Sequence, residues 1–323
     1  MELNTLHTEN TVNLDIVDQV VASIGQVLLG KQNQVKLALA CILARGHLLI
    51  EDMPGMGKTT LAQAVADVLG LSYKRVQFTS DLLPADLLGI SIFNKQQNAF
   101  EFHHGPIFTQ LLLADEINRA SAKTQSALLE AMEEQQVSIE GETRLLADPF
   151  FVIATQNPSN YSGTYSLPES QLDRFTMRIS LGFPSREAER SMLLKMAQKE
   201  VSPEQGNARE RLPAQLSRAQ LKELQQQVVK VSVSDHILDY LQRLISFTRE
   251  DSQFSFGVSP RGSMALLSAA KAWALLEKRD FLLPEDIQQV FGAVIGHRLS
   301  GASNSGNSEQ MSRYILEQVD VLY

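Results

Sequence analysis

The clearest chemical pattern lies in the stretch GHLLIEDMPGMGKTT, which runs from Gly46 to Thr60. Glycines have no Cβ, so the backbone can curl until several N–H groups converge on one anion, and the positive end of the following helix adds to that field. Lys58 can then reach the terminal phosphates of a nucleotide, and Thr59 can offer its hydroxyl to Mg²⁺. We therefore expect an ATP-binding loop made of Pro54, Gly55, Met56, Gly57, Lys58, Thr59 and Thr60.

Asp52 departs from the usual GxxxxGK[ST] pattern, because it stands where the first glycine is expected. A carboxylate at this position would repel a triphosphate unless its side chain turns away. The Pro54-Gly55 pair can still supply the turn, so the prediction of a phosphate loop stands. The alternative is an ordinary strand-to-helix turn with an exposed lysine.

A second motif, LLLADE, runs from Leu111 to Glu116. Its apolar run suits a strand buried on both faces of a parallel sheet, and its two carboxylates would reach the crevice at the carboxyl edge of that sheet. Asp115 is expected to hold Mg²⁺ through its water shell, and Glu116 to orient and deprotonate an attacking water. Buried strands often end in acids, so the motif gains its weight from the phosphate loop that precedes it.

A third candidate is Asn157, which leaves the end of another apolar run, FFVIA, at Phe150 to Ala154. If the sheet is parallel, Asn157 can hydrogen-bond either the γ-phosphate or the water held by Glu116. The alternative is an asparagine that serves a turn before Pro158.

The elements that must position these residues alternate between strand-length apolar runs and helical patterns. Strands are expected at residues 47–50, 73–78, 111–116, 150–154 and 177–181, and hairpins at 90–102 and 137–146. From Arg186 onward strands disappear and helices follow. We predict an α/β domain with a parallel central sheet flanked by helices in residues 1–184, and a small all-helical domain in residues 185–323.

Composition places the chain among ordinary globular proteins, with 323 residues, 44% hydrophobic and 20% charged. Lys plus Arg number 29 against 37 Asp plus Glu, and the net charge of −8 disfavours nucleic acid as the main partner, although a local basic channel in a ring could hide inside an acidic average. No basic segment leads into an apolar stretch at the start, and no window approaches the roughly 20 apolar residues that span a bilayer. We expect a cytoplasmic protein without membrane insertion.

Several other residues are candidates with a simpler interpretation. Cys41 is the only cysteine and lies in a helical pattern, which favours a buried core residue over a reactive thiol. His103 and His104 are adjacent and so point to different faces, which disfavours a shared metal site. The segment from Val27 to Gly30 interrupts two helical patterns and could pack on the adenine base, but apolar segments also pack on sheets without any such role.

Taken in order after the phosphate loop, the motifs LLLADEINRA, TQNP, LPESQLDRF and GVSPRG make the chain similar to the MoxR branch of the AAA+ ATPases. The resemblance runs from about Val17 to Leu299 and implies a P-loop AAA+ domain followed by a helical lid. It also implies that the hairpin at 90–102 is the helix-2 insert, that the hairpin at 137–146 precedes the first sensor residue, and that both face the pore of a ring.

The resemblance assigns further site residues. Asn157 matches the sensor-1 position, Arg261 matches the sensor-2 arginine of the lid, and Arg174 matches the arginine finger that reaches a neighbouring subunit's nucleotide. An arginine supplied across an interface stabilises charge on the transferred phosphoryl group, so hydrolysis would require the assembled ring. Without the resemblance, Arg174 could pair with Asp173 or cap a helix.

The expected function is therefore ATP hydrolysis to ADP and phosphate in a ring, with a hexamer as the expected size, coupled to chaperone-like remodelling or assembly of a client protein or metal-cofactor complex. Family members often act with a partner that carries a von Willebrand factor A domain, which the resemblance alone implies. Two alternatives remain: an interaction scaffold switched by ATP binding with little turnover, and a chelatase-type motor subunit that inserts a metal into a macrocycle. The intact Glu116 disfavours the scaffold, because a pure switch needs no water-activating carboxylate.

Overall fold

The computed structural model describes residues 14–157, 167–200, 211–301 and 308–321. Its centre is a five-stranded sheet with the strand order β2-β5-β8-β1-β9, in which every neighbouring pair is parallel. The strands are β1 (Leu48–Glu51), β2 (Tyr73–Gln77), β5 (Leu111–Asp115), β8 (Phe151–Gln156) and β9 (Met177–Ile179). The predicted parallel sheet is confirmed.

The side chains of the sheet alternate between two apolar clusters, one on each face. In β5, Leu111 and Leu113 belong to the first cluster, whereas Leu112 and Ala114 belong to the second. The same alternation holds in β1 and β8. A strand buried on both faces needs an uninterrupted apolar run, and this is why LLLA marks it in the sequence.

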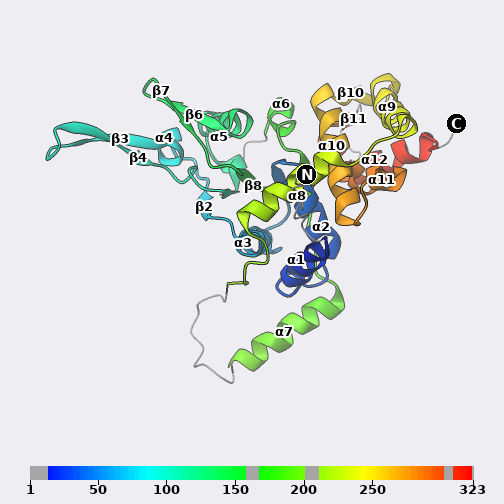
Figure 1. The fold of residues 1–323 in the computed structure, drawn as a ribbon, viewed down its shortest axis with the longest axis horizontal. Coiled ribbons are helices and arrows are strands. Elements are labelled where there is room, and N and C mark those ends of the chain that lie inside the picture. The colour runs from blue at the N-terminus through cyan, green and yellow to red at the C-terminus, as the bar shows by residue number, and fades with distance from the viewer. Residues whose placement is uncertain (1–13, 158–166, 201–210, 302–307, 322–323) are drawn as a thin grey trace, which may run out of the picture.

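Helices cover both faces of the sheet, and more helices follow it (Figure 1). The α-helices are α1 (Asp15–Gly25), α2 (Gln32–Leu43), α3 (Lys58–Val68), α4 (Pro84–Leu88), α5 (Ala122–Glu134), α6 (Glu169–Leu172), α7 (Arg186–Glu200), α8 (Arg218–Lys230), α9 (Asp235–Glu250), α10 (Pro260–Leu276), α11 (Pro284–Ile295) and α12 (Ser308–Gln318), and a 3₁₀ turn, η1, spans Ile117–Arg119. None of the helices in the described ranges has the length and hydropathy that a bilayer crossing requires.

Both predicted hairpins are present and project from the sheet (Figure 1). The first pairs β3 (Gly89–Asn94) with β4 (Ala99–His104), and the second pairs β6 (Gln136–Ile139) with β7 (Glu142–Leu145). The guanidinium of Arg144 in the second hairpin lies 4.0 Å from the ring centroid of Phe102 in the first. The two hairpins therefore contact each other.

The C-terminal part is mainly helical, but the expectation that strands disappear after Arg186 is wrong. A small antiparallel pair joins β10 (Phe254–Phe256) to β11 (Ser300–Gly301). These strands have only three and two residues, so they carry no period-2 pattern that a sequence could reveal.

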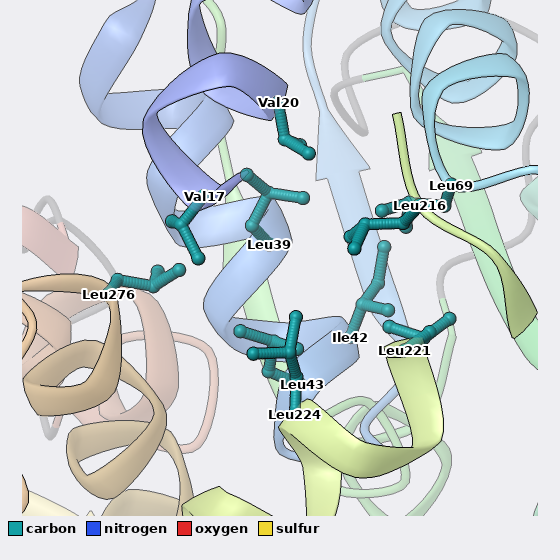
Figure 2. A pocket seen from close by; sticks show the side chains of 10 residues that line it. All are labelled: Val17, Val20, Leu39, Ile42, Leu43, Leu69, Leu216, Leu221, Leu224 and Leu276. Atoms are coloured by element: carbon teal, nitrogen blue, oxygen red, sulfur yellow. The ribbon is translucent and has the colours of Figure 1, made fainter. Parts of the chain in front are cut away.

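The C-terminal helices share one apolar cluster with the N-terminal helices and with one face of the sheet. Figure 2 shows the seam, where side chains from α1, α2 and α8 and from Leu276 of α10 point toward a common space. That space is entirely apolar in its lining and measures about 10 Å³, which is too small for a ligand. The seam is thus a packed core that joins the two parts of the chain.

Candidate nucleotide site

The phosphate loop lies between β1 and α3, as the sequence predicts. Gly55 and Gly57 have φ angles of 86° and 92°, which residues with a Cβ rarely adopt. Gly57 is the N-cap of the 11-residue helix α3, so the first amides of that helix point toward the loop. This arrangement fits an anion such as a nucleotide phosphate.

Lys58 is the first residue of α3 and is buried, with 8% of its surface exposed. Its Nζ donates to the backbone oxygen of Asp52 at 2.6 Å, the backbone oxygen of Gln156 at 3.3 Å and Oδ1 of Asn157 at 3.0 Å. Burial lowers the pKa of Lys58, while the nearby carboxylates of Asp52, Asp115 and others oppose that shift. A buried ammonium whose direct partners are neutral oxygens is suited to attract an anionic phosphate.

Asp52 turns its carboxylate away from the loop. Oδ2 accepts hydrogen bonds from the amides of Leu181 and Gly182, both at 2.7 Å, and from Oγ of Ser180 at 3.1 Å. Oδ1 accepts from the amide of Met53 at 3.0 Å. The residue that departs from the usual motif thus fastens the end of β9 to the loop, and the condition under which a phosphate could still bind is met.

Asp115 ends β5 at the carboxyl edge of the sheet and is 7% exposed. Its Oδ1 accepts a hydrogen bond of 2.5 Å from Oγ1 of Thr155, and its Oδ2 accepts from Nη2 of Arg75 at 2.6 Å and from Nε of Arg75 at 3.1 Å. Asp115 and Thr59 both line the same cleft. A carboxylate and a hydroxyl are oxygen ligands of the kind Mg²⁺ prefers, so this donor set fits the ion that the family implies.

Glu116 follows with a φ of 56°, a left-handed conformation that is uncommon outside glycine. Its Oε1 accepts from Nδ2 of Asn157 at 3.1 Å, and its Oε2 accepts from Nε2 of Gln77 at 2.8 Å and from Nη1 of Arg119 at 2.7 Å. Three donors, from β2, from η1 and from the residue that follows β8, therefore fix the direction of this carboxylate.

Asn157 lies between the two charged groups and is 8% exposed. Its amide oxygen accepts from Lys58, and its amide nitrogen donates to Glu116. Its backbone oxygen accepts from Nδ2 of Asn118 at 3.2 Å. Among the residues that the structure describes, this asparagine directly links Lys58, the candidate phosphate-binding residue, to the candidate base Glu116. Pro158, on which the turn interpretation depends, lies outside those residues.

These side chains surround an open cleft of about 350 Å³. Its described lining residues are Pro54, Gly55, Gly57, Lys58, Thr59, Thr60, Arg75, Gln77, Asp115, Glu116 and Asn157. Met56 lies in the loop as predicted from its position, its partly buried side chain packs against the apolar cluster, and its role in binding stays a prediction. Sequence reasoning missed Arg75, Gln77 and Thr155, because only the parallel register of β2, β5 and β8 brings them to the motif carboxylates.

The segment from Val27 to Gly30 lies beside the phosphate loop. A Cβ placed on Gly57 would come within 3.3 Å of Cδ1 of Leu28, and one on Gly30 within 3.5 Å of Cβ of Ala188 at the start of α7. Val27 is 37% exposed. This position is compatible with a contact to the base, and the roles of Val27 and Gly30 stay predictions.

Arg174 and Arg261 lie together at a different place. Nε of Arg174 is 3.4 Å from Oε2 of Glu133 near the end of α5, and Nη2 of Arg261 donates to Oε1 of the same carboxylate. Neither arginine is among the described residues that line the cleft around Lys58. The structure therefore brings Lys58, Asp115, Glu116 and Asn157 together and places the two arginines elsewhere.

Cys41 follows its simpler interpretation, and His103 and His104 are exposed on the first hairpin. Cys41 is fully buried in α2, and burial raises its pKa to about 12. A thiol that stays protonated at neutral pH is not a nucleophile.

Comparisons with known proteins agree with this geometry. Residues 47–177 match the model of the ATPase family associated with various cellular activities (AAA), and residues 246–318 match the AAA lid domain. The chain is 45% identical over 284 residues to the uncharacterized protein YeaC of Bacillus subtilis, covering 88% of this chain and 87% of the relative. It is 38% identical over 292 residues to chaperone MoxR1 of Mycobacterium tuberculosis, covering 88% and 75%.

A solved structure supports the same conclusion. The crystal structure of a Cytophaga hutchinsonii protein, described as a candidate ATPase, superposes with a TM-score of 0.85 at 35% identity and covers 95% of each chain. Two proteins named MoxR, from Paracoccus denitrificans and Methylorubrum extorquens, are 30% and 28% identical over 86% and 92% of this chain. The chain belongs to the MoxR family of AAA+ ATPases.

Proposed function

We propose that the protein hydrolyses ATP to ADP and phosphate in the cleft around Lys58. The observation that carries this proposal is the hydrogen-bonded link from Lys58 through Asn157 to Glu116. It holds a cation for the phosphates and a carboxylate for the water in one fixed geometry, which is what phosphoryl transfer requires of an enzyme.

Each residue then has a distinct role. The loop amides and Lys58 bind the phosphates, Thr59 and Asp115 would hold Mg²⁺, and Glu116 takes a proton from the attacking water. Asn157 orients the water or the γ-phosphate between them. Bound Mg²⁺ would neutralise part of the charge on the phosphate oxygens. Gln77 and Arg119 hold Glu116 at its other oxygen and so restrict its direction.

The two arginines act, in this proposal, on the nucleotide of a neighbouring subunit. Arg174 and Arg261 converge on the carboxylate of Glu133 and do not line the cleft of their own chain. Because the carboxylate of Glu133 pairs with both guanidinium groups, an anionic phosphate could bind the same two arginines in its place. Hydrolysis would then depend on assembly into a ring, with a hexamer as the expected size.

The ring would remodel a client protein, with the two hairpins as its contacts. On the first hairpin Ile90, Phe93 and Phe100 are 47%, 45% and 74% exposed, and exposed apolar side chains of this kind suit a protein partner. The name of the relative chaperone MoxR1 supports a chaperone-like role. A partner with a von Willebrand factor A domain rests on the family alone, and a cytoplasmic location stays the expectation that the sequence analysis gives.

The proposal is tested by mixing two inactive variants. Glu116→Gln removes the base but leaves Arg174 and Arg261 in place, whereas Arg174→Ala leaves the cleft intact but removes one of the arginines. Mixed rings contain interfaces in which an intact cleft meets an intact arginine pair. We expect ATP turnover to reappear on mixing, at a rate that follows the fraction of such interfaces.

Two controls define the outcome. Glu116→Gln and Arg174→Ala must each bind ATP when alone, and mixing Glu116→Gln with Lys58→Ala must not restore turnover, because neither cleft is functional. If the first mixture stays inactive while its subunits assemble together, the arginines do not act across an interface and the proposed arrangement is wrong.

A further inference from the structure

The turn that carries Arg174 is held by an arginine of the C-terminal part. This turn, Asp173 to Thr176, connects α6 to β9, and Arg298 reaches it from just beyond the end of α11. The side chain of Arg298 is 4% exposed, and its Nε lies 2.6 Å from Oδ1 of Asp173. A buried guanidinium needs partners for its charge and for each of its donors.

Arg298 has acceptors for all five of its N–H groups. Besides the bond from Nε, Nη2 donates to the backbone oxygens of Asp173 at 3.0 Å and of Phe175 at 2.7 Å. Nη1 donates to the backbone oxygen of Thr176 at 3.2 Å and to that of Val294 in α11. Four of the five bonds thus go to the turn that bears Arg174, and the fifth returns to the helix that precedes Arg298.

The helix that carries Arg261 is tied to the same turn. Oγ of Ser259, the N-cap of α10, donates to Oδ2 of Asp173 at 3.0 Å and accepts from the amide of Gly262 at 3.0 Å. Gly262 leaves room for the side chain of Arg298, because a Cβ on Gly262 would lie 2.9 Å from Cδ of Arg298. Asp173 therefore contacts both Arg298 and the start of α10, next to both candidate phosphate-binding arginines.

We infer that Arg298 is a positioning residue for the reaction of the neighbouring subunit. It joins the turn of Arg174 to the lid, so that Arg174 and Arg261 form one rigid pair whose position follows the lid. This inference rests on the proposed function, in which those two arginines act across an interface. Its consequence is that a change in lid position alters catalysis in the next subunit, not in its own.

The test extends the mixing of Glu116→Gln subunits with Arg174→Ala subunits. Arg298→Lys keeps the charge but offers three donors from one nitrogen, which cannot reach the same five acceptors. When Arg298→Lys is placed in the Glu116→Gln subunit, which supplies the arginines, the restored turnover should fall by about 100-fold, as expected for a misplaced catalytic group. Placed in the Arg174→Ala subunit, which donates only the cleft, it should change turnover less than about twofold, because no phosphate contact is lost.

A matched control separates positioning from stability. Arg279 pairs with Asp286 entirely within the lid, with Nη1 2.7 Å from Oδ2, so Arg279→Lys disturbs a similar ion pair away from the turn. We expect it to show no such asymmetry. If Arg298→Lys fails to fold in both placements, Asp173→Asn is placed in the same two ways, with the same asymmetry expected.

The outcomes are distinct. If folded Arg298→Lys leaves turnover unchanged in both subunits, or lowers it equally in both, the inference is wrong and the proposed function stands. Failure of the parent mixture to regain turnover overturns the proposed action of the arginines across an interface, and this inference with it.

Discussion

At the scale of single residues, the proposed function divides binding and hydrolysis between two charged groups joined by one amide. Lys58 would hold the phosphates and Glu116 would face the water, and Asn157 contacts both side chains. Because the two tasks depend on different side chains, substitution of each should give a different kinetic result.

Lys58→Ala and Glu116→Gln form a matched pair that separates these tasks. ATP at 100 times its Kd should raise the free energy of unfolding of the wild type by about 2.7 kcal/mol. Glu116→Gln should keep this stabilisation but lower kcat by about 10²- to 10⁴-fold, because it removes the base. Lys58→Ala should lose the stabilisation. Unfolding with and without ATP, together with steady-state turnover, checks both; wild-type turnover by Glu116→Gln would refute the catalytic assignment.

Asp52→Gly restores the usual motif and should nevertheless harm the protein. The carboxylate accepts hydrogen bonds from three backbone amides and Ser180, and each buried donor left unpaired costs about 1–3 kcal/mol. We expect urea unfolding to show a loss of about 2–4 kcal/mol, with a smaller loss for Asp52→Asn, and no gain in ATP affinity. Unchanged stability together with tenfold tighter ATP binding would mean that the carboxylate opposes the phosphates.

Local sequence predicts the residues of this site that belong to motifs but not those that support them. Lys58, Asp115 and Glu116 stand at fixed spacing after apolar strands, whereas Arg75 and Gln77 are ordinary polar residues of an exposed strand edge. Their contact with the motif carboxylates depends on the pairing of Gln77 with Asp115 across the sheet. That register is a tertiary property, and no short pattern encodes it.

At the scale of elements, periodicity predicts those that bury a regular face. The parallel strands and the long C-terminal helices appear where apolar spacing puts them, and the hairpins follow from turns such as Glu140-Gly141, both with positive φ. The pair β10–β11 could not be predicted, since its strands are too short for a pattern and pair only because the lid brings them together.

His47, the residue before β1, shows how one buried side chain joins two elements, β8 and α5. Its Nδ1 accepts from the amide of Val152 in β8 at 3.0 Å, and its Nε2 donates to the backbone oxygen of Met132 in α5 at 3.2 Å. This pattern requires the neutral ring with its proton on Nε2. Burial lowers the pKa of His47 from 6.5 to about 4.

The lowered pKa predicts a loss of stability in mild acid. Below pH 6.5 His47 is protonated in the unfolded chain, whereas in the folded chain it stays neutral down to about pH 4. The free energy of unfolding therefore decreases as the pH falls from 6.5 to about 4. Between pH 7.5 and pH 5 this amounts to about 2 kcal/mol from His47. His297, whose pKa burial also lowers, adds a loss of the same sign. Urea unfolding of wild type and His47→Gln at the two pH values measures the share of His47; an equal loss in both would assign it elsewhere.

At the scale of the whole molecule, the N-terminal helices, the sheet and the lid share one apolar cluster. The lid also holds the turn of Arg174 through Arg298, and Glu133 gathers both arginines. These contacts join residues far apart in the sequence, so motif order predicts which arginines matter but not where the folded chain holds them. The division at residue 184 stays a prediction.

The central claim is that catalysis needs a second subunit. The most direct measurement is steady-state ATP turnover per subunit against protein concentration, for wild type and Arg174→Ala, with the molecular mass determined in parallel. We expect wild-type turnover per subunit to rise as oligomers form, and Arg174→Ala to lose about 10³-fold or more while it still binds ATP. Turnover per subunit that is the same for monomers and oligomers, and unaffected by Arg174→Ala, would contradict the account.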